Sequence, residues 1–319
     1  MATRAPFVCP AGTVGTTCKV GTTKTDYPLW TRDPFATRVM PTPPGCGTDP
    51  VPTTSATGVT TYSPGTYCQG ISISGAGKNV IFNSGIYFLG GSNNSAASNL
   101  SLSSNGGAIN QTIVTAAALS TAGTGYKKND TLTVVGGTFV FAATIKVTTV
   151  NGTGGITAVT IANAGAYRGT LPSNPVSVTG GSGTGAKFAL TFTPPPTGVT
   201  FILTGPTAAT VGSVSIQNTT LSFTAITGGA TDNLIFWQNK KATGAGGSFA
   251  GNPSASTSFT GAMYFPSTSV TVSGNSTFLP TNCTAIVANT ISFSGNGSIS
   301  KGCLSISGGG GATSFRMSQ

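Results

Sequence analysis

Apolar and small polar residues alternate in a short pattern that recurs along this chain, and Gly or Asn closes most copies. The clearest copies occupy 71–75, 270–275 and 291–296, and looser ones occupy 100–103, 214–218 and 304–308. Alternation with a period of two is typical of a β-strand with one buried face, and Gly or Asn tolerates the positive φ of a tight corner. The pattern predicts brief strands separated by sharp turns, and therefore an all-β fold.

The spacing of these strands predicts how they stack. They pause at Asn105 and resume at 199–203, and in the last third of the chain matching strands recur after 23 and after 21 residues. A period near 20 with about three short strands in each period indicates a solenoid, and we expect a right-handed parallel β-helix. The aromatic residues expected to stack in its interior are Phe82, Phe201, Phe223, Phe236, Phe265 and Phe293.

A different repeat fills the pause in the strand pattern. The segment 122–137 is echoed by 164–181 at offsets of 42 and 44 residues, and each copy is followed by an alternating strand, at 142–150 and at 186–192. This repeat predicts an all-β domain with tandem halves over 106–196. Because corners of a solenoid tolerate long insertions, we expect this domain to be inserted at one of them.

The remaining segments complete the predicted domain organisation. Five prolines between 41 and 52 interrupt any regular element, so we interpret 1–58 as an extended strap that docks on the next domain. The solenoid is predicted to be discontinuous, over 59–105 and 197–307, and a tail of 308–319 ends the chain. The open ends of such a stack are strand edges, and the strap is a candidate cap for one of them.

Composition limits the chemistry available to this chain. Only 6% of the 319 residues are charged, there is no His, and the five acidic residues are all Asp, at 26, 33, 49, 130 and 232. A Ser/His/Asp or Cys/His arrangement is therefore excluded, and a convergent pair of carboxylates is not expected. We predict a noncatalytic protein with no cofactor and no metal site. If the chain were a polysaccharide-active enzyme, Asp232 would be its best catalytic candidate.

Six cysteines indicate disulfide bonds. They are Cys9, Cys18, Cys46, Cys68, Cys283 and Cys303. None forms a C-x-x-C motif, and pairing by proximity gives Cys9 with Cys18, Cys46 with Cys68, and Cys283 with Cys303, among 15 possible pairings. The alternative is six buried thiols in a reducing cytosol. An even number of cysteines in a low-charge chain rich in Ser, Thr and Gly favours disulfides, and with them an extracellular or periplasmic location.

Neither a phosphate-binding loop nor an export signal is expected from this sequence. The stretches 74–79 and 180–187 lack the spacing of a phosphate-binding loop, so we interpret their glycines as turn residues. Residues 1–30 lack the apolar core of an export signal, and no apolar run reaches the length of about 18 residues that spans a bilayer. We therefore expect no membrane span in this chain, and a targeting segment or anchor that was removed or lies upstream of Met1.

The net charge of +10 bears on the choice of partner. Positive residues are scattered, with adjacent pairs only at Lys127-Lys128 and Lys240-Lys241, and no basic stripe is interleaved with aromatic residues. Specific binding to nucleic acid is therefore not expected. Weak, salt-sensitive attachment to an acidic polysaccharide of a cell envelope fits this distribution better.

Several phrases resemble a known family. The segments 62–71, 84–88 and 198–205, together with 234–238, 259–266 and 283–291, are similar to the C-terminal region of TadG-like proteins of the Flp (tight adherence) pilus system. The resemblance covers about 30–105 and 197–319, and it implies a component of the bacterial envelope with no catalytic residues. Two features depart from the family: its amino-terminal anchor helix is missing, and the 106–196 insertion interrupts its pattern.

These observations favour a structural or adhesive component of the bacterial cell envelope or surface. Its expected partners are envelope or pilus proteins, and copies of itself joined through the solenoid ends. The insertion is also similar to repeats of phage tail proteins, so a phage-type fibre or an extracellular filament subunit is the alternative. A polysaccharide-active β-helix enzyme is the third possibility.

Overall fold

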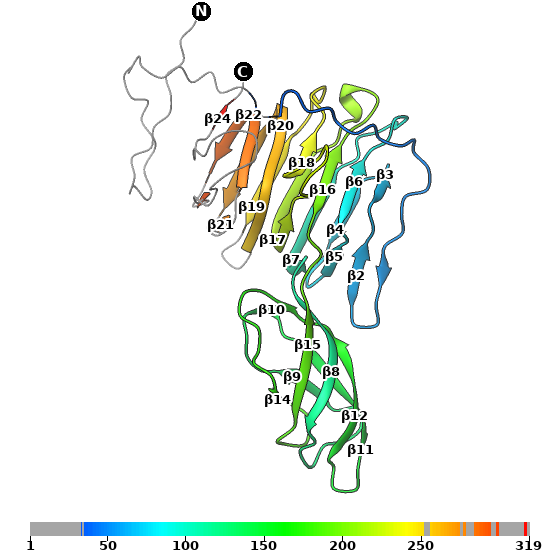
Figure 1. Ribbon diagram of the computed structural model, residues 1–319, viewed down its shortest axis with the longest axis vertical. Helices are drawn as coiled ribbons and strands as arrows, with labels where there is room; N and C mark the ends of the chain where they lie inside the picture. Colours follow the sequence, from blue (N-terminus) through cyan, green and yellow to red (C-terminus); the bar gives the residue numbers. More distant parts are fainter. Residues whose placement is uncertain are drawn as a thin grey trace, which may run out of the picture. The chain divides into compact units, whose positions relative to one another are not determined.

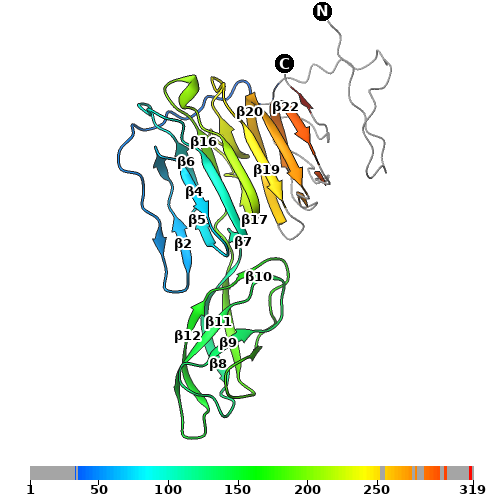
Figure 2. The same ribbon diagram turned by 180° about the vertical axis from the view of Figure 1, so that it is seen from behind.

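The structure is a computed structural model, and its regular elements are almost all β-strands (Figures 1 and 2). It describes residues 33, 35–251, 256–274, 277–278, 284–294, 298–299 and 316–317. In this part of the chain the helical structure is a single 3-10 turn at Ala208–Thr210. The chain forms two compact units, Met1–Thr37 and Arg38–Gln319, so the boundary between them lies within the predicted 1–58 strap. The all-β prediction is confirmed.

The larger sheet has 16 strands, of which 15 form three ladders of parallel strands and one, β1 (Thr53–Thr54), is added antiparallel at the edge. The first ladder contains β2 (Val59–Tyr62), β5 (Asn79–Phe82), the ends of β7 (Leu100–Ile109) and β17 (Val214–Thr224), the start of β20 (Ser256–Gly274), β21 (Thr277–Phe278) and β23 (Ser298–Ile299). The second ladder contains β3 (Gly65–Tyr67), β6 (Gly85–Leu89), β16 (Val199–Leu203), β18 (Leu234–Gln238), the middle of β20, the start of β22 (Thr284–Phe293) and β24 (Arg316–Met317). The third ladder contains β4 (Ile71–Ser74), the starts of β7 and β17, β19 (Gly247–Gly251), and the ends of β20 and β22.

The chain visits these ladders in the same order, first, second and third, and then returns to the first. We call this part of the molecule the parallel body. Between the first and the last described turns, each strand therefore pairs with the equivalent strand one turn earlier and one turn later. Similar residues meet across the turns, and the row Tyr87, Phe201 and Phe236 is an example.

The interior of the parallel body is a continuous aromatic cluster. Five of the predicted interior residues are fully buried: Phe82, Phe201, Phe223, Phe236 and Phe265. The ring centroids of Phe82 and Phe201 are 5.3 Å apart, and those of Phe201 and Phe236 are 5.6 Å apart. The prediction is confirmed for these five, while the side chain of Phe293 lies outside the described residues. Aromatic packing in register joins each turn to the next.

One predicted boundary is wrong, because β7 does not stop at Asn105. The strand turns a corner and continues to Ile109, pairing with β17 at Ser103↔Gln217 and again at Gly107↔Thr219. Gly106 makes this corner at a φ of 65°, and Asn218 makes the matching corner of β17 at 50°. The glycines at 106 and 107 look like the start of a loop in the sequence, yet they allow a sharp bend within a paired strand. The 59–105 segment therefore extends to Ile109.

The insertion forms a separate antiparallel sheet of six strands, which we call the inserted module. Its strands, in spatial order, are β12 (Ile156–Asn163), β11 (Thr144–Val150), β9 (Thr131–Val134), β14 (Val176–Thr179), β15 (Lys187–Thr193) and β8 (Ile113–Thr121). A second sheet pairs β10 (Phe139–Phe141) with β13 (Ala166–Tyr167). Buried residues of the six strands form a core of their own, centred on Leu132, Ile145 and Phe188.

The two halves of the inserted module are related like the partners of a symmetric dimer. Exchanging β8, β9 and β11 with β12, β14 and β15 reverses the strand order and otherwise leaves it unchanged. The last strand of each half pairs with the first strand of the other half, in β15–β8 and β11–β12. The central pair, β9 with β14, is antiparallel, as a two-fold axis requires.

Two side-chain hydrogen bonds obey the same two-fold relation between the halves. The backbone N–H of Ala186 donates to the Tyr126 hydroxyl (3.4 Å), and that of Ala143 donates to the Tyr167 hydroxyl (3.0 Å). Tyr126 and Ala143 belong to the first half, and the other two residues belong to the second. The sheet also closes toward a barrel, because Val114 N bonds Ala164 O and Ile156 N bonds Ala122 O. Each half therefore completes the other.

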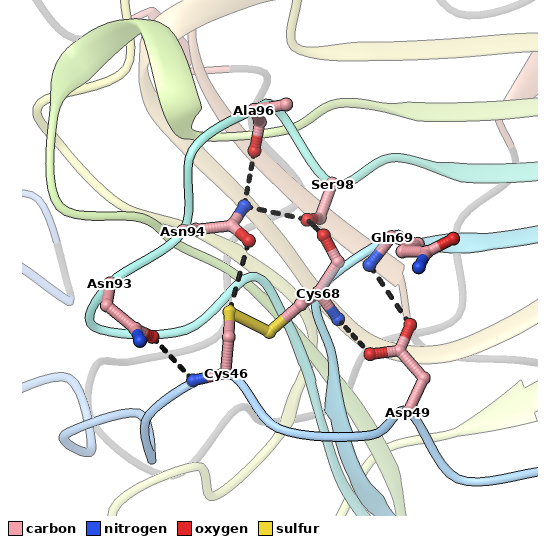
Figure 3. Close-up of a disulfide and its surroundings, with 8 residues drawn as sticks. All are labelled: Cys46, Asp49, Cys68, Gln69, Asn93, Asn94, Ala96 and Ser98. Atoms are coloured by element: carbon pink, nitrogen blue, oxygen red, sulfur yellow. Dashed lines mark hydrogen bonds between the residues drawn. A yellow bond between two sulfur atoms is a disulfide. The ribbon is translucent and has the colours of Figure 1, made fainter.

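Residues 38–58, the later part of the segment 1–58 that the sequence analysis interprets as a strap, run along the first turn of the parallel body and are fastened to it (Figure 3). A disulfide joins Cys46 to Cys68, and the Asp49 carboxylate accepts hydrogen bonds from the backbone of Cys68 (2.7 Å) and of Gln69 (3.0 Å). A side chain at Gly65 would meet the Pro50 ring at 2.7 Å. Beyond these contacts, β1 (Thr53–Thr54) pairs antiparallel with β2. The strap thus covers the outer edges of β2 and β3.

Candidate functional site

The strands of the third ladder, among them β4, β7, β17 and β19, lie side by side in Figure 2, and their outward face carries two rows of mostly polar side chains. The central row places one hydroxyl on each of six consecutive strands: Ser72, Ser101, Ser215, Ser248, Thr271 and Ser292. A second row, two residues further along each strand, contains Ser74, Ser103, Gln217, Ala250 and Ser273. We call these two rows the hydroxyl face.

The pairing register of the parallel strands produces the hydroxyl face. Between the two rows, Ile73, Leu102 and Ile216 point inward and are buried beside their equivalents on later turns. Parallel strands lie about 4.8 Å apart, and residues i and i+2 of one strand are about 6.6 Å apart. The hydroxyl groups therefore occupy a two-dimensional lattice fixed by the backbone and by the core beneath it.

The face is neutral and exposed. Neither row contains a charged or an aromatic residue, and Ser72, Ser103, Gln217 and Ser292 are exposed, whereas Ser101, Ser215, Ser248 and Thr271 are half-buried between their neighbours. The hydroxyls of Thr271 and Ser292 lie 3.1 Å apart across the ladder. Each hydroxyl can donate one hydrogen bond and accept two, so the face can bind any partner that is itself a network of donors and acceptors.

The carboxylates of the described residues are engaged in turns. Asp130 accepts hydrogen bonds from Lys127 N (3.0 Å) and from Ser182 N (2.9 Å) and Oγ (2.8 Å), which lower its pKa. Asp33 accepts from Phe35 N (2.9 Å), and Asp49 holds the strap as described above. Asp26 lies outside the described residues.

Asp232, the catalytic candidate of the enzyme alternative, occupies a turn before β18. Its carboxylate accepts a hydrogen bond from Gly228 N (2.6 Å), and the Arg38 guanidinium lies 3.9 Å away. Arg38 also donates to the backbone carbonyl of Asp232. The carboxylate therefore fixes a turn and joins it to the strap. Within the described ranges, no cluster of three Cys or Asp residues is placed to hold a metal ion.

The glycine-rich stretches form turns, and the two lysine pairs lie apart from each other. Gly75 and Gly77, like Gly180 and Gly181, adopt positive φ in turns, as the sequence predicts. The pairs 127–128 and 240–241 belong to different parts of the chain, and Lys241 Nζ donates to Pro206 O (3.0 Å). They do not form one basic patch.

A shallow groove of about 390 Å³ lies where the inserted module joins the parallel body. It is lined by Ser84, Gly85, Thr197, Gly198 and 224–227. Ser84 Oγ donates to the Thr197 carbonyl and so ties the two sides together. The lining contains no titratable side chain, so the groove offers hydroxyl and backbone groups together with the apolar side chains of Ala225 and Ile226.

Two buried tyrosines, Tyr67 and Tyr87, and the half-buried Tyr62 lie in the first turns of the parallel body. Burial raises the pKa of Tyr67 to about 12, with further contributions from Tyr62 and Asp49. Burial also raises the pKa of Tyr62 and of Tyr87. The Tyr67 hydroxyl donates to Ser63 O (2.6 Å), and the Tyr87 hydroxyl donates to Tyr62 O (2.9 Å) and Asn83 O (2.8 Å). The hydroxyls of Tyr67 and Tyr87 therefore act as hydrogen-bond donors that fix the corner between the first and second ladders.

Of the three disulfide pairings that proximity suggests, Cys46–Cys68 is present, and the described part of the chain contains no free cysteine. The other four, Cys9, Cys18, Cys283 and Cys303, lie outside the described residues. Sequence reasoning missed β19, which contributes Ser248 to the hydroxyl face. The signal was present at 247–251, where Gly-Ser-Phe-Ala-Gly repeats the alternation with smaller residues.

Comparison with protein-family models, with curated proteins and with solved structures gives no match to this chain. Within the described part of the chain, no helix has the length and the apolar character that crossing a bilayer requires.

Proposed function

We propose that this chain is a noncatalytic structural or adhesive component of the bacterial cell envelope or surface, related to the TadG-like proteins of the Flp pilus system. We further propose that the parallel body is a right-handed parallel β-helix. The repeated order of the ladders supports a helix, and parallel crossovers in one sheet are right-handed in nearly all proteins. The Cys46–Cys68 disulfide supports an extracellular or periplasmic location.

One observation carries the proposal: the outer edges of β2 and β3 in the first turn are covered by a strap that is fastened three ways. The disulfide, the Asp49 carboxylate and the β1–β2 pair all bind this segment to the edge of the stack. A stack whose edge is covered can remain a single rod, and a rod of parallel turns with an aromatic interior resists bending and unfolding. Stiffness of this kind suits a protein whose role is mechanical.

Electrostatics adds a mode of attachment. The positive charges are dispersed rather than gathered at one site, so the chain would adhere weakly to acidic envelope polysaccharide and release it as salt rises. Envelope or pilus proteins would then be its specific partners.

The test separates a structural carboxylate from a catalytic one. Replacing Asp232 by Asn should lower the melting temperature slightly, because the Arg38 pairing is lost, and should leave adhesion of producing cells unchanged. Cell fractionation should place the protein outside the cytoplasm, and deletion of its gene should reduce surface attachment. A cytoplasmic protein, or polysaccharide cleavage that Asp232→Asn abolishes at full stability, would overturn the proposal.

A filament subunit is the second candidate, and one observation favours it. In the described part of the chain, β4 pairs with β7 on one side and with no strand on the other, so the first turn keeps one uncovered edge. Such an edge can accept a strand from a second copy. Electron microscopy of the purified protein distinguishes the two candidates, since a polymer supports the filament and a monodisperse rod supports the envelope component.

A further inference from the structure

Asn151 and Gly152 lie in the turn that joins β11 to β12, and with them the two halves of the inserted module, and both residues are exposed. The Asn151 side chain folds back over this turn. Its Oδ1 accepts three hydrogen bonds, from Thr153 N (3.1 Å), Thr153 Oγ1 (2.9 Å) and Gly155 N (2.7 Å). A Cβ at position 155 would lie 2.9 Å from Asn151 Nδ2, so glycine at this position leaves room for the amide. The amide oxygen is thus held in a cradle of three donors.

The cradle prepares the Cγ atom of Asn151 for attack by a nucleophile. Its donors polarise the amide carbonyl, and they surround the oxygen on which negative charge would develop if a nucleophile added to Cγ. In the part of the chain that the structure describes, Asn151 Nδ2 donates no hydrogen bond, so this nitrogen is not held back as a leaving group. Gly152 N also donates to no acceptor among these residues, and glycine has no side chain to hinder the approach of its nitrogen to Cγ.

Contacts with the first half of the module hold the turn in this shape. Gly125 N donates to Thr153 O (3.1 Å), and Tyr126 N donates to Gly154 O (2.9 Å). A Cβ at position 154, where φ is +74°, would lie 2.6 Å from Gly125 N, so the two loops pack closely. Within the turn, Gly154 N donates to Asn151 O (3.0 Å). The donors around Oδ1 are therefore preorganised and need not reorient during a reaction.

We propose that Asn151 is a site of self-catalysed deamidation. Gly152 N attacks Asn151 Cγ and gives up its proton to solvent, the Cγ–Nδ2 bond breaks, and Nδ2 takes up a proton and leaves as ammonia. A cyclic imide then joins the two residues. Water opens this imide at Cγ, which gives aspartate, or at the main-chain carbonyl carbon, which gives isoaspartate. The net charge of +10 falls by one, and the proposal is independent of the envelope function.

A second Asn-Gly pair in the described residues provides an internal comparison. Asn105 and Gly106 lie within β7, which pairs with strands of the neighbouring turns, and Asn105 O accepts a hydrogen bond from Gly77 N (3.1 Å). Ring closure changes the backbone geometry at the asparagine, and pairing opposes that change. In the folded protein we therefore expect position 105 to react more slowly than position 151.

The test follows the full chain over time by mass spectrometry of its peptides, in buffer and in concentrated urea. Circular dichroism verifies the folded and the unfolded state. An isoaspartyl methyltransferase with a labelled methyl donor then measures the isoaspartate formed at each position. Conversion at Asn151 should be about tenfold faster in the folded protein than in urea, because unfolding removes the cradle. A folded-state rate at Asn151 that is equal to the rate in urea, or below it, overturns the proposal.

Two variants with a matched control locate the cause in the turn. Thr153→Val keeps the branched side chain but removes one donor, and should slow conversion about tenfold in the folded protein and not in urea. Thr157→Val removes an exposed hydroxyl of β12 and should leave the rate unchanged. A Cβ at position 152 would meet no atom within 4 Å, so Gly152→Ala should stay folded and slow the reaction in both states. A folded Thr153→Val protein that converts as fast as the wild type overturns the proposal.

Discussion

The parallel body and the inserted module are both made of repeated sequences, but their repeats meet in different ways. In the body, each turn is displaced along the stack, so equivalent residues such as Phe201 and Phe236 face each other. In the module, the two halves are related by a half-turn, so the last strand of each half pairs with the first strand of the other. The body can therefore grow by adding turns, whereas the module is complete at two halves.

The two modes of repetition also distribute stability differently. A residue in the body interior contacts its own equivalents on both sides, so a change at one turn affects its neighbours. A residue in the module contacts a non-equivalent position in the other half. The effect of a substitution there is therefore confined to the two halves of the module. Four substitutions or conditions test this difference, and they follow from the largest expected effect to the smallest.

The largest effect is expected from a cavity in the aromatic interior. Phe236→Ala removes a fully buried ring that lies near Phe201, Phe223 and Phe259, and should cost about 3–5 kcal/mol of the free energy of unfolding. Phe139→Ala in the module, where the side chain is 42% exposed, should cost about 1 kcal/mol or less. Urea unfolding followed by circular dichroism measures both. Equal losses would contradict the contrast between a shared interior and a closed pair.

Removing the disulfide that fastens the strap should have the next largest effect on stability. The double variant Cys46→Ser, Cys68→Ser opens a loop with a sequence separation of 22 and should cost about 3 kcal/mol. The strand edges of the first turn then become available, so the body should self-associate while the module keeps its fold. Analytical ultracentrifugation detects this, and Leu171→Ala, at an exposed module position, serves as the control. A variant that stays monomeric at wild-type stability would show that the strap is not a cap.

Alkaline pH should weaken the first turns through their tyrosines. Burial raises the pKa of Tyr67 to about 12, above its value of about 10 in the unfolded chain, so the folded state holds the proton more tightly. This contribution to stability is complete below pH 10 and is lost as the pH rises through 12. Melting temperatures at stepped pH should therefore fall over this interval, and they should fall less steeply in Tyr67→Phe. A flat profile would contradict the burial of these hydroxyls.

The smallest effect tests the exchange between module halves. Tyr126→Phe and Tyr167→Phe each remove the hydroxyl that accepts a hydrogen bond from the opposite half, and each should cost about 1 kcal/mol. Because the two positions are equivalent, the losses should be similar, and urea unfolding compares them directly. A large loss at one position and none at the other would show that the halves are equivalent in strand order only.

Much of this architecture follows from the sequence because its repeats are local. Alternation predicts the strands, the period near 20 predicts parallel stacking of equivalent strands, and proximity predicts the Cys46–Cys68 pair. The interior phenylalanines follow from the same register. The weak copy at 247–251 was missed because glycine fills the inward positions on both sides of Phe249, which leaves a single apolar side chain to mark the alternation.

The exchange of strands between module halves could not be predicted. Offsets of 42 and 44 reveal that two halves are alike, but the same offsets fit a displacement or a half-turn. The choice depends on which strand edges meet in space, as in the β15–β8 pair between residues far apart in the chain. For the same reason, the alignment of six hydroxyls across the third ladder emerges only when the register of all its strands is known.

The corner that precedes the second ladder bears on how this protein can change over evolution. That corner takes two residues at Ser63-Pro64 and two at Asn83-Ser84, and one turn later it accommodates the whole of 110–198 while the strands on either side keep their parallel pairing. Extra length at a loop costs little free energy when both ends are already held in place. Recombination can therefore replace what is carried at this corner, and so give the parallel body a new accessory domain, without disturbing the register of its strands.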